Sequence, residues 1–455
     1  MSVAAIQASK LGGYRRIDAE YYQPYLLRDE LLIQQIKWPV VPLGELVKEG
    51  YRVVYENTFI ADEPFDPEAH VKFLQAADIL SDFPAIGLDS MGWVSRDDWI
   101  RYPKGRVKAG EILVEVKGKV EKVAMVPDDF PQEVLITGTL YKMLVNENKV
   151  SPQYVLIYLL SRFGRNFRDR VKTNTLISFV SKEELYSISI PVPSPDTQKQ
   201  ISSKYQKAYA SYRASEALYA QAQALLAAEL GLDKLDLSES LYSVRNVSEV
   251  RESGRADAEF FSQRYQRILA LMRRSGQTVE DFANLMTRRF KPQIGQPFNY
   301  IEIGDVNGDG FLSNQTLLGE EAPSRAQWIM QAGDVITSTV RPIRCLSALV
   351  EQEQEGFVCS SGFAVLQPKD VEPELLLLYL RLPIVCEVLD LYTTASMYPA
   401  ISTTDLMNIP ITLPESKALQ KNLVAKVYES RQAYHDAQRL LAEAKAEVER
   451  MLEGA

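Results

Sequence analysis

A duplicated series of short motifs constrains the fold of this chain more than any other feature. Arg16-Ile-Asp-Ala-Glu-Tyr-Tyr22 returns later as Arg255-Ala-Asp-Ala-Glu-Phe-Phe261. Each copy is followed by a pattern that predicts an amphipathic helix, and Pro24 lies where a first-turn proline is tolerated. Self-similarity of this kind indicates that one structural unit occurs twice.

Six further landmarks follow each copy in the same order. They are a strand-like run, an Ala-Gly-acid turn that begins a strand, another strand, a proline-initiated helix, a threonine-rich loop and a strand ending in proline. The matched pairs are Phe73–Ile79 with Tyr300–Val306, Ala109–Leu113 with Ala332–Ile336, Thr137–Tyr141 with Ser361–Val365, Pro152 with Pro373, Thr173–Thr175 with Thr393–Ser396, and Ile190-Pro191 with Ile409-Pro410. Chance similarity would not preserve this order, and the drifting spacing indicates loops of unequal length.

Each half ends in a long predicted helix that carries a coiled-coil seam. In the first helix, Thr197–Leu230, apolar residues recur at alternating steps of four and three, with Ser215 as one polar break. The second, Glu415–Glu453, repeats the pattern. Prolines precede both helices, and Gly231 ends the first. We expect the two helices to pack on each other; the alternative is that each covers only its own domain.

The patterns predict an α+β chain with a pseudo-twofold internal repeat, in which two tandem β-rich domains are separated by two long helices. The polar segment Leu232–Gly254 is interpreted as a linker. The predicted parts are an N-terminal helical region at 1–36, a first β-rich domain at 37–195, a central long helix at 196–231, the linker with the helix that opens the second repeat at 232–274, a second β-rich domain at 275–414 and a C-terminal long helix at 415–455.

Composition indicates a protein of the cytosol. The 455 residues suffice for two or three domains, and 46% apolar with 24% charged residues is ordinary for a soluble protein. The apolar runs are too short to span a membrane, and Met1–Arg16 lacks the apolar core of a secretion signal. Three cysteines without a CxxC pair fit a reducing compartment. We therefore expect a cytoplasmic protein with no membrane partner.

The sequence offers few groups for catalysis. Its two histidines, His70 and His435, have no cysteine or histidine neighbour at metal-ligand spacing, and no glycine-rich phosphate loop is present. No Pro-Pro pair occurs, so the Asn/Asp-Pro-Pro-aromatic signature of amino-methyltransferases is absent. Asp305–Gly310 begins like a calcium loop, but Thr316 stands where a bidentate glutamate is required. We expect no catalytic residue, no metal and no cofactor of the chain's own.

One pattern points instead to an enzyme. Glu111-Ile-Leu-Val-Glu115-Val-Lys117 resembles a strand of metal-dependent nucleases, in which carboxylates hold Mg²⁺ and a lysine steadies the attacking water. The repeat argues against this hypothesis, because Glu115 corresponds to Ser338 and Lys117 to Val340 in the second half.

Together, the motifs resemble the specificity subunit of type I restriction–modification systems, the HsdS type. Each motif alone is degenerate, whereas their duplicated order is specific and covers nearly the whole chain. The resemblance is carried by the Arg16 motif with its copy at Arg255, the turns at Ala109 and Ala332, and the strand ends Ile190–Pro193 with Gln198 and Gln200 and Ile409–Pro414 with Gln420. The family often has a Pro-Pro pair at the helix start, where this chain has Pro191-Val-Pro193-Ser-Pro195, so the start of the first long helix stays open.

The resemblance implies a non-catalytic DNA-recognition subunit. Each β-rich domain would be a target recognition domain for one half of a split double-stranded DNA sequence, and the helices would form an antiparallel coiled coil that spaces them. Two methyltransferase subunits, which bind S-adenosylmethionine, would dock on this scaffold. Restriction and translocase subunits would join them in phage defence.

Basic clusters are the candidate DNA-binding residues. A net charge of −9 argues weakly against nucleic acid, but DNA binding needs only a local basic patch. In such a patch Lys and Arg contact phosphates, while amides and hydroxyls can reach base edges. The candidates are Arg162, Arg165, Arg168, Arg170, Lys172, Thr173, Asn174, Thr175, Lys117 and Lys119 in the first half, and Arg341, Arg344, Thr393, Thr394 and Ser396 in the second.

Further basic groups extend these candidates. They are Arg101, Lys104, Arg106 and Lys108 in the first half, and Arg288, Arg289 and Lys291 in the second. For any single residue, a solvated surface charge is an equally good interpretation. Beside the nuclease, two alternatives stay open: a specificity subunit of another phage-defence or type II methyltransferase complex, and a purely structural coiled-coil adaptor, which would leave the duplicated domains unexplained.

Overall fold

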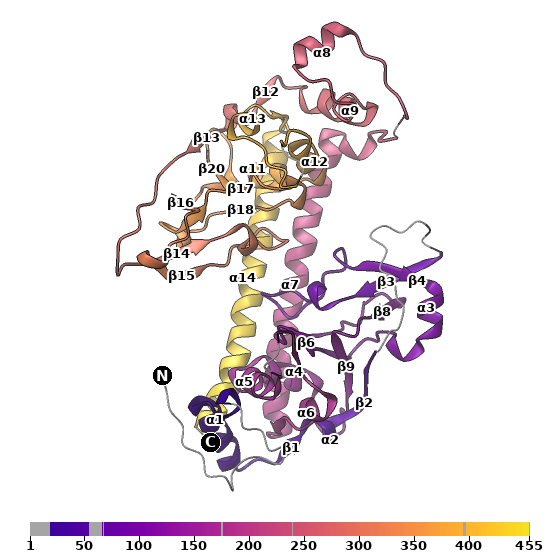
Figure 1. The fold of residues 1–455 in the computed structure, drawn as a ribbon, viewed down its shortest axis with the longest axis vertical. Coiled ribbons are helices and arrows are strands. Elements are labelled where there is room, and N and C mark those ends of the chain that lie inside the picture. The colour runs from indigo at the N-terminus through magenta and orange to yellow at the C-terminus, as the bar shows by residue number, and fades with distance from the viewer. Residues whose placement is uncertain are drawn as a thin grey trace. The chain divides into compact units, whose positions relative to one another are not determined.

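The computed structural model describes residues 19–53, 66, 68–173, 176–238, 240–394 and 397–454. Arg16 of the first motif lies outside these residues, as do Asn174, Thr175 and Ser396. The chain divides into two compact units, the first made of Met1–Ser211 and His435–Ala455 and the second of Tyr212–Tyr434. Each unit contains one β-rich domain and a part of each long helix (Figure 1).

The first unit is built on two main sheets. An antiparallel sheet has the order β2-β9-β5-β7, and a mixed sheet has the order β4-β3-β8, in which β3 and β8 are parallel. Two short pairs, β1-β11 and β10-β6, complete it. The strands are β1 Val40–Pro42, β2 Val47–Arg52, β3 His70–Leu74, β4 Gly92–Ser95, β5 Ile112–Glu115, β6 Lys117–Gly118, β7 Val123–Met125, β8 Val134–Ile136, β9 Leu140–Val145, β10 Ser178–Phe179 and β11 Ser189–Pro191.

The second unit repeats this topology. Its antiparallel sheet β13-β20-β17-β18 corresponds to the first one, and its mixed sheet β15-β14-β19-β16 again contains a parallel pair, β14 with β19. The short pair β12-β21 corresponds to β1-β11. The strands are β12 Gln277–Thr278, β13 Ala283–Met286, β14 Pro297–Ile301, β15 Gln315–Leu318, β16 Ala326–Ile329, β17 Val335–Ser338, β18 Ser347–Leu349, β19 Val358–Ser360, β20 Phe363–Pro368 and β21 Pro410–Ile411. The predicted internal repeat is thus confirmed in the two main sheets, although the mixed sheet of the second unit has one strand more, β16.

Short helices occupy matching places in the two units. The helices that begin at Pro152 and Pro373 each carry a buried tyrosine whose hydroxyl donates to the last strand of its unit: Tyr158 to the Ser189 carbonyl and Tyr379 to that of Pro410. The helices of the first unit are α1 Pro24–Gln35, α2 Leu43–Leu46, α3 Arg96–Arg101, α4 Pro152–Leu160, α5 Arg162–Val171 and α6 Lys182–Tyr186. Those of the second are α8 Val247–Ser253, α9 Gln263–Met272, α10 Val279–Phe282, α11 Pro373–Leu380, α12 Pro383–Leu391 and α13 Thr403–Met407.

The two long helices begin at slightly different residues from those predicted. The first, α7, is Pro195–Leu230, because a proline at the first helical position needs no amide donor and has a helical φ. Gly231 ends it in the left-handed conformation, with φ of 75°. The second, α14, is Lys417–Glu453.

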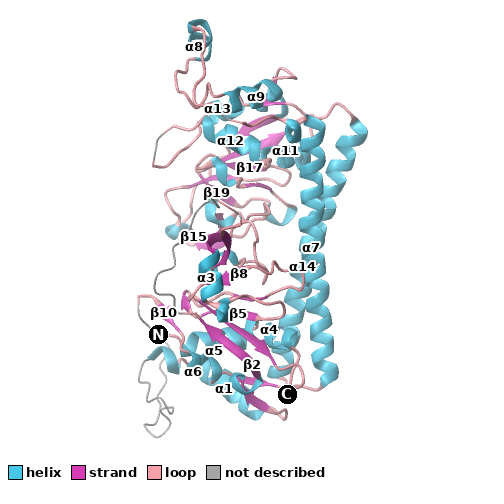
Figure 2. Cartoon of the chain, turned by 90° about the vertical axis from the view of Figure 1, so that its right-hand side faces the viewer, coloured by secondary structure: helices cyan, strands magenta, loops and turns pink. Residues whose placement is uncertain are grey.

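Within each unit, segments of α7 and α14 pack side by side (Figure 2). In the second unit Ser215 contacts Ser430 and Lys426 donates to Gln221, so the paired residue numbers run in opposite directions. The predicted seam is buried throughout, except that Tyr219 is half-buried and Leu452 rather than Met451 is buried at the end. The mutual antiparallel packing of the helices is therefore the correct alternative.

The segment interpreted as a linker is more structured than expected. Leu232–Gly254 contains a 3₁₀ turn, Leu232–Lys234, and the helix α8, whose residues are not buried. Gly254 ends α8 in the left-handed conformation. None of the helices in the described part of the chain combines the length and apolarity that a membrane span requires.

The polar break in the seam gives a test of the helix packing. The Ser430 hydroxyl donates to the Ser215 carbonyl at 2.9 Å, and the two buried hydroxyl oxygens are 3.2 Å apart. Ser430→Ala should lower the free energy of unfolding by about 1 kcal/mol, because it leaves the buried Ser215 hydroxyl without this partner. Ser215→Ala in addition should cost less than the sum of both single changes, as measured by urea unfolding.

Ser203→Ala in α7 is the control, since Ser203 is only half-buried and should change stability little. Strict additivity of Ser215→Ala and Ser430→Ala would contradict a direct contact between the two side chains.

Candidate nucleic-acid interface

In the first unit, the loop that follows β5 lies beside the threonine-rich loop. Ser178 and Phe179 of β10 pair with Gly118 and Lys117 of β6, and the Val180 amide donates to the Val116 carbonyl at 2.9 Å. We call residues 116–122 together with 172–173 and 176–180 the first loop pair. The predicted candidates Lys117, Lys119 and Thr173 are therefore brought together, although they are distant in the sequence.

The second unit contains the same arrangement. Val340 forms a β-bridge with Ala400, the Arg341 amide donates to the Pro399 carbonyl at 2.8 Å, and the Ile401 amide to that of Thr339 at 2.9 Å. We call residues 339–347 together with 393–394 and 397–401 the second loop pair. Arg341, Arg344, Thr393 and Thr394 thus lie in the loop pair that corresponds to the first.

Backbone strain marks both loop pairs. In the described part of the chain, the non-glycine residues with positive φ are Val120 at 63°, Arg341 at 49°, Cys345 at 55° and Asp370 at 56°. All but Asp370 belong to the loop pairs. Such conformations cost of order 1–3 kcal/mol each and cluster at functional sites, where the surrounding structure holds them in place. The backbone strain therefore marks these loops as candidates for the functional site.

Exposed basic and apolar side chains share the surface of each loop pair. The first exposes Lys117, Lys119, Leu176 and Ile177, and the second exposes Arg341, Arg344, Met397 and Tyr398. The Arg341 guanidinium also lies 5.5 Å from the centre of the Tyr398 ring. Cations can neutralise phosphates, and flat or apolar groups can contact base methyls and sugars. Charge alone did not predict the apolar members, but an apolar pair follows the threonine-rich loop in both repeats and could have signalled them.

Glu115 organises the first loop and is not free to hold a metal. Its carboxylate accepts hydrogen bonds from three backbone amides, those of Lys119, Glu121 and Lys122, at 3.0–3.2 Å. Among the residues that the structure describes, no three His, Cys, Asp or Glu side chains are grouped as a metal site requires. The calcium-like turn is likewise closed on itself, since the Asn307 side chain accepts from the amides of Asp309 and Phe311.

Most of the arginines predicted on α5 face inward or bind protein groups. Arg168 is buried, and burial lowers the pKa of its guanidinium to about 10, so it is still charged at neutral pH. Arg170 is buried too and pairs with Glu30. Arg162 pairs with Asp29 and Glu453. The basic residues of this stretch therefore largely form a structural network. The prediction that Arg168 and Arg170 contact DNA phosphates is wrong, because both side chains are buried.

The remaining predicted residues of this stretch divide by position. Arg165 is exposed on α5, and Lys172 pairs with Asp169 at 2.7 Å. The Thr173 hydroxyl accepts from the Phe179 amide, and the hydroxyls of Thr393 and Thr394 donate to backbone carbonyls. These three threonines thus stabilise their loops. Asn174, Thr175 and Ser396 lie outside the described residues.

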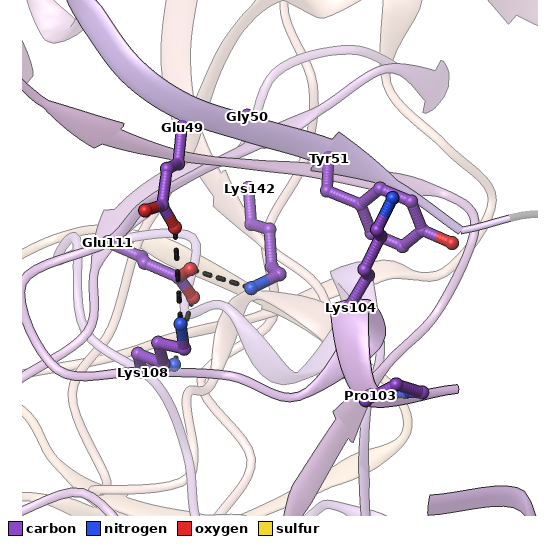
Figure 3. A pocket seen from close by; sticks show the side chains of 8 residues that line it. All are labelled: Glu49, Gly50, Tyr51, Pro103, Lys104, Lys108, Glu111 and Lys142. Carbon is purple, nitrogen blue, oxygen red and sulfur yellow. Dashed lines mark hydrogen bonds and ion pairs between the residues drawn. The ribbon is translucent and has the colours of Figure 1, made fainter. Parts of the chain in front are cut away.

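Two of the further basic groups of the first half, Lys104 and Lys108, border a pocket of about 430 Å³ in the first unit (Figure 3). The pocket is lined by Lys104, Lys108 and Glu49 at its exposed rim and by a buried ion pair, Lys142 with Glu111, at 2.6 Å. Glu111 immediately precedes β5, whereas the first loop pair follows the other end of that strand. These lysines are therefore not brought together with Lys117 and Lys119.

Gly118 gives a test of how the first loop is built. Its φ is 123°, and a Cβ there would meet a carboxylate oxygen of Glu115 at 2.6 Å. Gly118→Ala should therefore disrupt the loop, and hydrogen exchange of the amides of Lys119, Glu121 and Lys122 should accelerate about tenfold or more. Gly110→Ala is the matched control, because Gly110 also has positive φ, 79°, but a Cβ there would meet no atom within 4 Å. Equal protection of the three amides in both variants would refute the role of Glu115.

Comparison with known proteins agrees with the resemblance seen in the motifs. No protein-family model matches the chain. The specificity subunit of the type I restriction enzyme HindI from Haemophilus influenzae is 24% identical over 150 residues, which are 32% of this chain and 33% of that protein. The match thus spans about a third of the relative's length.

Solved structures of the same kind were also found. The HsdS subunit from Thermoanaerobacter tengcongensis has a TM-score of 0.29 at 17% identity, covering 92% of this chain and 96% of that one. The type I S subunit from M. genitalium has a TM-score of 0.41 at 12% identity, with the same coverage. TM-scores of this size do not establish a common arrangement of the whole chain. The similarity in sequence, by contrast, is to a type I specificity subunit, which is the family that the duplicated motifs resemble.

Proposed function

We propose that this chain is the sequence-specific DNA-binding subunit of a type I restriction–modification complex, and that each β-rich domain reads one half of a bipartite target. The observation that carries the proposal is the duplicated loop pair. Each unit presents exposed cations and exposed apolar or aromatic side chains on strained loops at the end of matching strands. The similarity to a type I specificity subunit supports the same function.

The exposed side chains suggest how the two parts of DNA recognition would be divided. Lys117 and Lys119, and in the second unit Arg344, are suited to phosphates, which give affinity without sequence preference. The Arg341 guanidinium lies 5.5 Å from the centre of the Tyr398 ring and donates to the Met397 carbonyl at 3.3 Å, and these two contacts would favour the fixed orientation that a bidentate contact to guanine requires. Base reading is therefore assigned first to Arg341.

The long helices would space the two readers and bind partner subunits. With 36 residues α7 is about 54 Å long, more than the roughly 34–36 Å between half-sites one DNA turn apart. Two methyltransferase subunits, each binding its own S-adenosylmethionine, would dock on this scaffold, and restriction and translocase subunits would complete the complex. The chain itself would supply recognition and no catalytic residue.

A second candidate is the same role in another phage-defence or type II methyltransferase complex. The loop pairs would act identically there, so the neighbouring genes rather than the fold distinguish the two. A nuclease that uses Glu115 and Lys117 is disfavoured, because backbone amides already occupy the Glu115 carboxylate.

Salt dependence tests the DNA contacts. Lys117→Gln with Lys119→Gln should weaken binding to the cognate duplex and reduce the slope of log affinity against log salt by about 1 for each phosphate that is no longer neutralised. Arg344→Gln should do the same in the second unit. Binding is measured by fluorescence anisotropy between about 50 and 200 mM salt, with the chain in its complex.

Lys37→Gln with Lys48→Gln is the matched control, since both lysines are exposed on the first unit but lie outside the loop pair. It removes the same net charge. If the control changes the slope as much as the loop variant does, only the overall charge matters and the loop pair is not the interface.

Exchange of one β-rich domain tests the division into half-sites. Residues 37–195 would be replaced by the corresponding domain of a specificity subunit with a different target. Methylome sequencing of cells that also carry the methyltransferase subunit should then show a change in one half of the methylated sequence. A change in both halves would mean that the two domains do not read independently.

A further inference from the structure

A buried arginine lies beneath the first loop pair. Arg168 of α5 is 1% exposed, and its guanidinium donates to the carbonyls of Val120 at 3.0 Å, Glu121 at 3.3 Å and Leu159 at 3.3 Å. Two of these carbonyls belong to the loop after β5 and the third to the end of α4. The arginine therefore ties the loop to the helices beneath it.

A second buried arginine lies beneath the second loop pair. Arg381, which follows α11, is 5% exposed and donates to the carbonyls of Cys345 at 3.1 Å and Ser347 at 2.9 Å, and also to that of Gly308. Its guanidinium lies 5.4 Å from the centre of the Tyr219 ring of α7, in the same unit.

In both units the arginine holds the carbonyl of a residue with positive φ. These residues are Val120 and Cys345. The left-handed conformation turns their carbonyls into the protein, where an unpaired carbonyl would cost about 1–3 kcal/mol. A hydrogen bond from a fixed cation removes this cost and favours the strained conformation over relaxed alternatives.

The two arginines do not occupy equivalent positions in the repeat. With Tyr158-Leu159 aligned on Tyr379-Leu380, Arg381 corresponds to Leu160 and Arg168 to Leu389. The units therefore share the contact, from a buried guanidinium to a left-handed loop carbonyl, although they place the arginine on different elements. What the repeat retains is the contact rather than the residue.

We propose that Arg168 and Arg381 are positioning residues for DNA sequence recognition. Each fixes the conformation of its loop from the inside, while the exposed residues of the same loop, Lys117 and Lys119 or Arg341 and Arg344, contact DNA. This inference rests on the proposed function and deepens it. Specificity would then depend on two residues that never touch a base.

The structure also shows where the first arginine could be moved. A cavity of about 140 Å³ in the first unit is lined by Glu121, Lys122 and Leu160, among others. Leu160 is the position that corresponds to Arg381. An arginine there would border this cavity, which is also lined by Glu121, whose carbonyl Arg168 now holds.

The test uses the chain in complex with its methyltransferase partner, read by methylome sequencing. Arg168→Met retains an unbranched apolar chain in place of the aliphatic part of the arginine but removes all donors, and should relax base discrimination on the order of tenfold in one half-site only. Arg381→Met should relax the other half-site. Arg168→Lys should retain part of the discrimination, because an ammonium can still bind a carbonyl.

Ile33→Ala in α1 and Ile268→Ala in α9 are the controls for stability, since both side chains are buried outside the loop pairs. They should lower the melting temperature without relaxing either half-site. If the arginine variants also lower the melting temperature without bias toward one half-site, their role is structural and the proposal is overturned.

A rescue variant completes the test. Arg168→Leu with Leu160→Arg moves the guanidinium to the place it has in the second unit, and should restore discrimination in the affected half-site. A folded double variant that stays relaxed would overturn the claim that the guanidinium contact, wherever it originates, is what positions the loop. If the unsubstituted complex methylates no bipartite sequence, the proposed function itself fails. If that complex is active but the arginine variants relax neither half-site selectively, only the inference about the arginines is refuted.

Discussion

The antiparallel contact between α7 and α14 is the interaction on which both units depend. The first unit takes its share of α14 from the far end of the chain: Lys204 pairs with Glu447, and the Arg162 amide donates to Glu449 at 2.6 Å. Residues 1–211 thus bury their helix seam only when residues 435–455 are present. Contacts of such long sequence separation are slow to form, because loop closure precedes any gain from packing.

Aromatic side chains attach each β-rich domain to its own helix segments. In the second unit Phe311 stacks on Tyr434 of α14 with ring centres 3.6 Å apart, and Arg431 lies 4.6 Å from the centre of the Phe311 ring while pairing with Glu351. In the first unit, the ring centre of Phe83, from the loop after β3, lies 6.5 Å from that of Tyr209 in α7. These contacts fix the direction in which each loop pair points from its helix, so the same packing that stabilises a unit also orients its loop pair.

The sequence predicted the backbone of this protein far better than its site. The order of repeated motifs, the helix seam and the turn glycines are local patterns, and the described residues follow them, apart from the first residues of the two long helices and the last seam position, which is Leu452 instead of Met451. Charge clustering was a poorer guide, because it does not show which way a side chain faces. Arg168 and Arg170 stand in the most basic stretch and are buried, whereas Lys117 and Lys119 belong to a loop that is completed by residues about 60 positions away. Only the tertiary pairing of β6 with β10 makes that surface visible.

The two units retain the same contacts but build them from different residues. The acid of each Ala-Gly turn is buried and neutralised, yet Glu111 pairs with Lys142 of β9 while Asp334 pairs with Arg288 from the loop after β13. Burial raises the pKa of Asp334, and the Gln331 amide and Arg288 partly offset this shift. Arg168 and Arg381 likewise make the same kind of contact to a loop carbonyl from different elements of the two units. Because breaking a buried charged contact is costly, such contacts can hold a backbone constant while the exposed residues vary. A scaffold of this kind can present two different exposed surfaces from one fold.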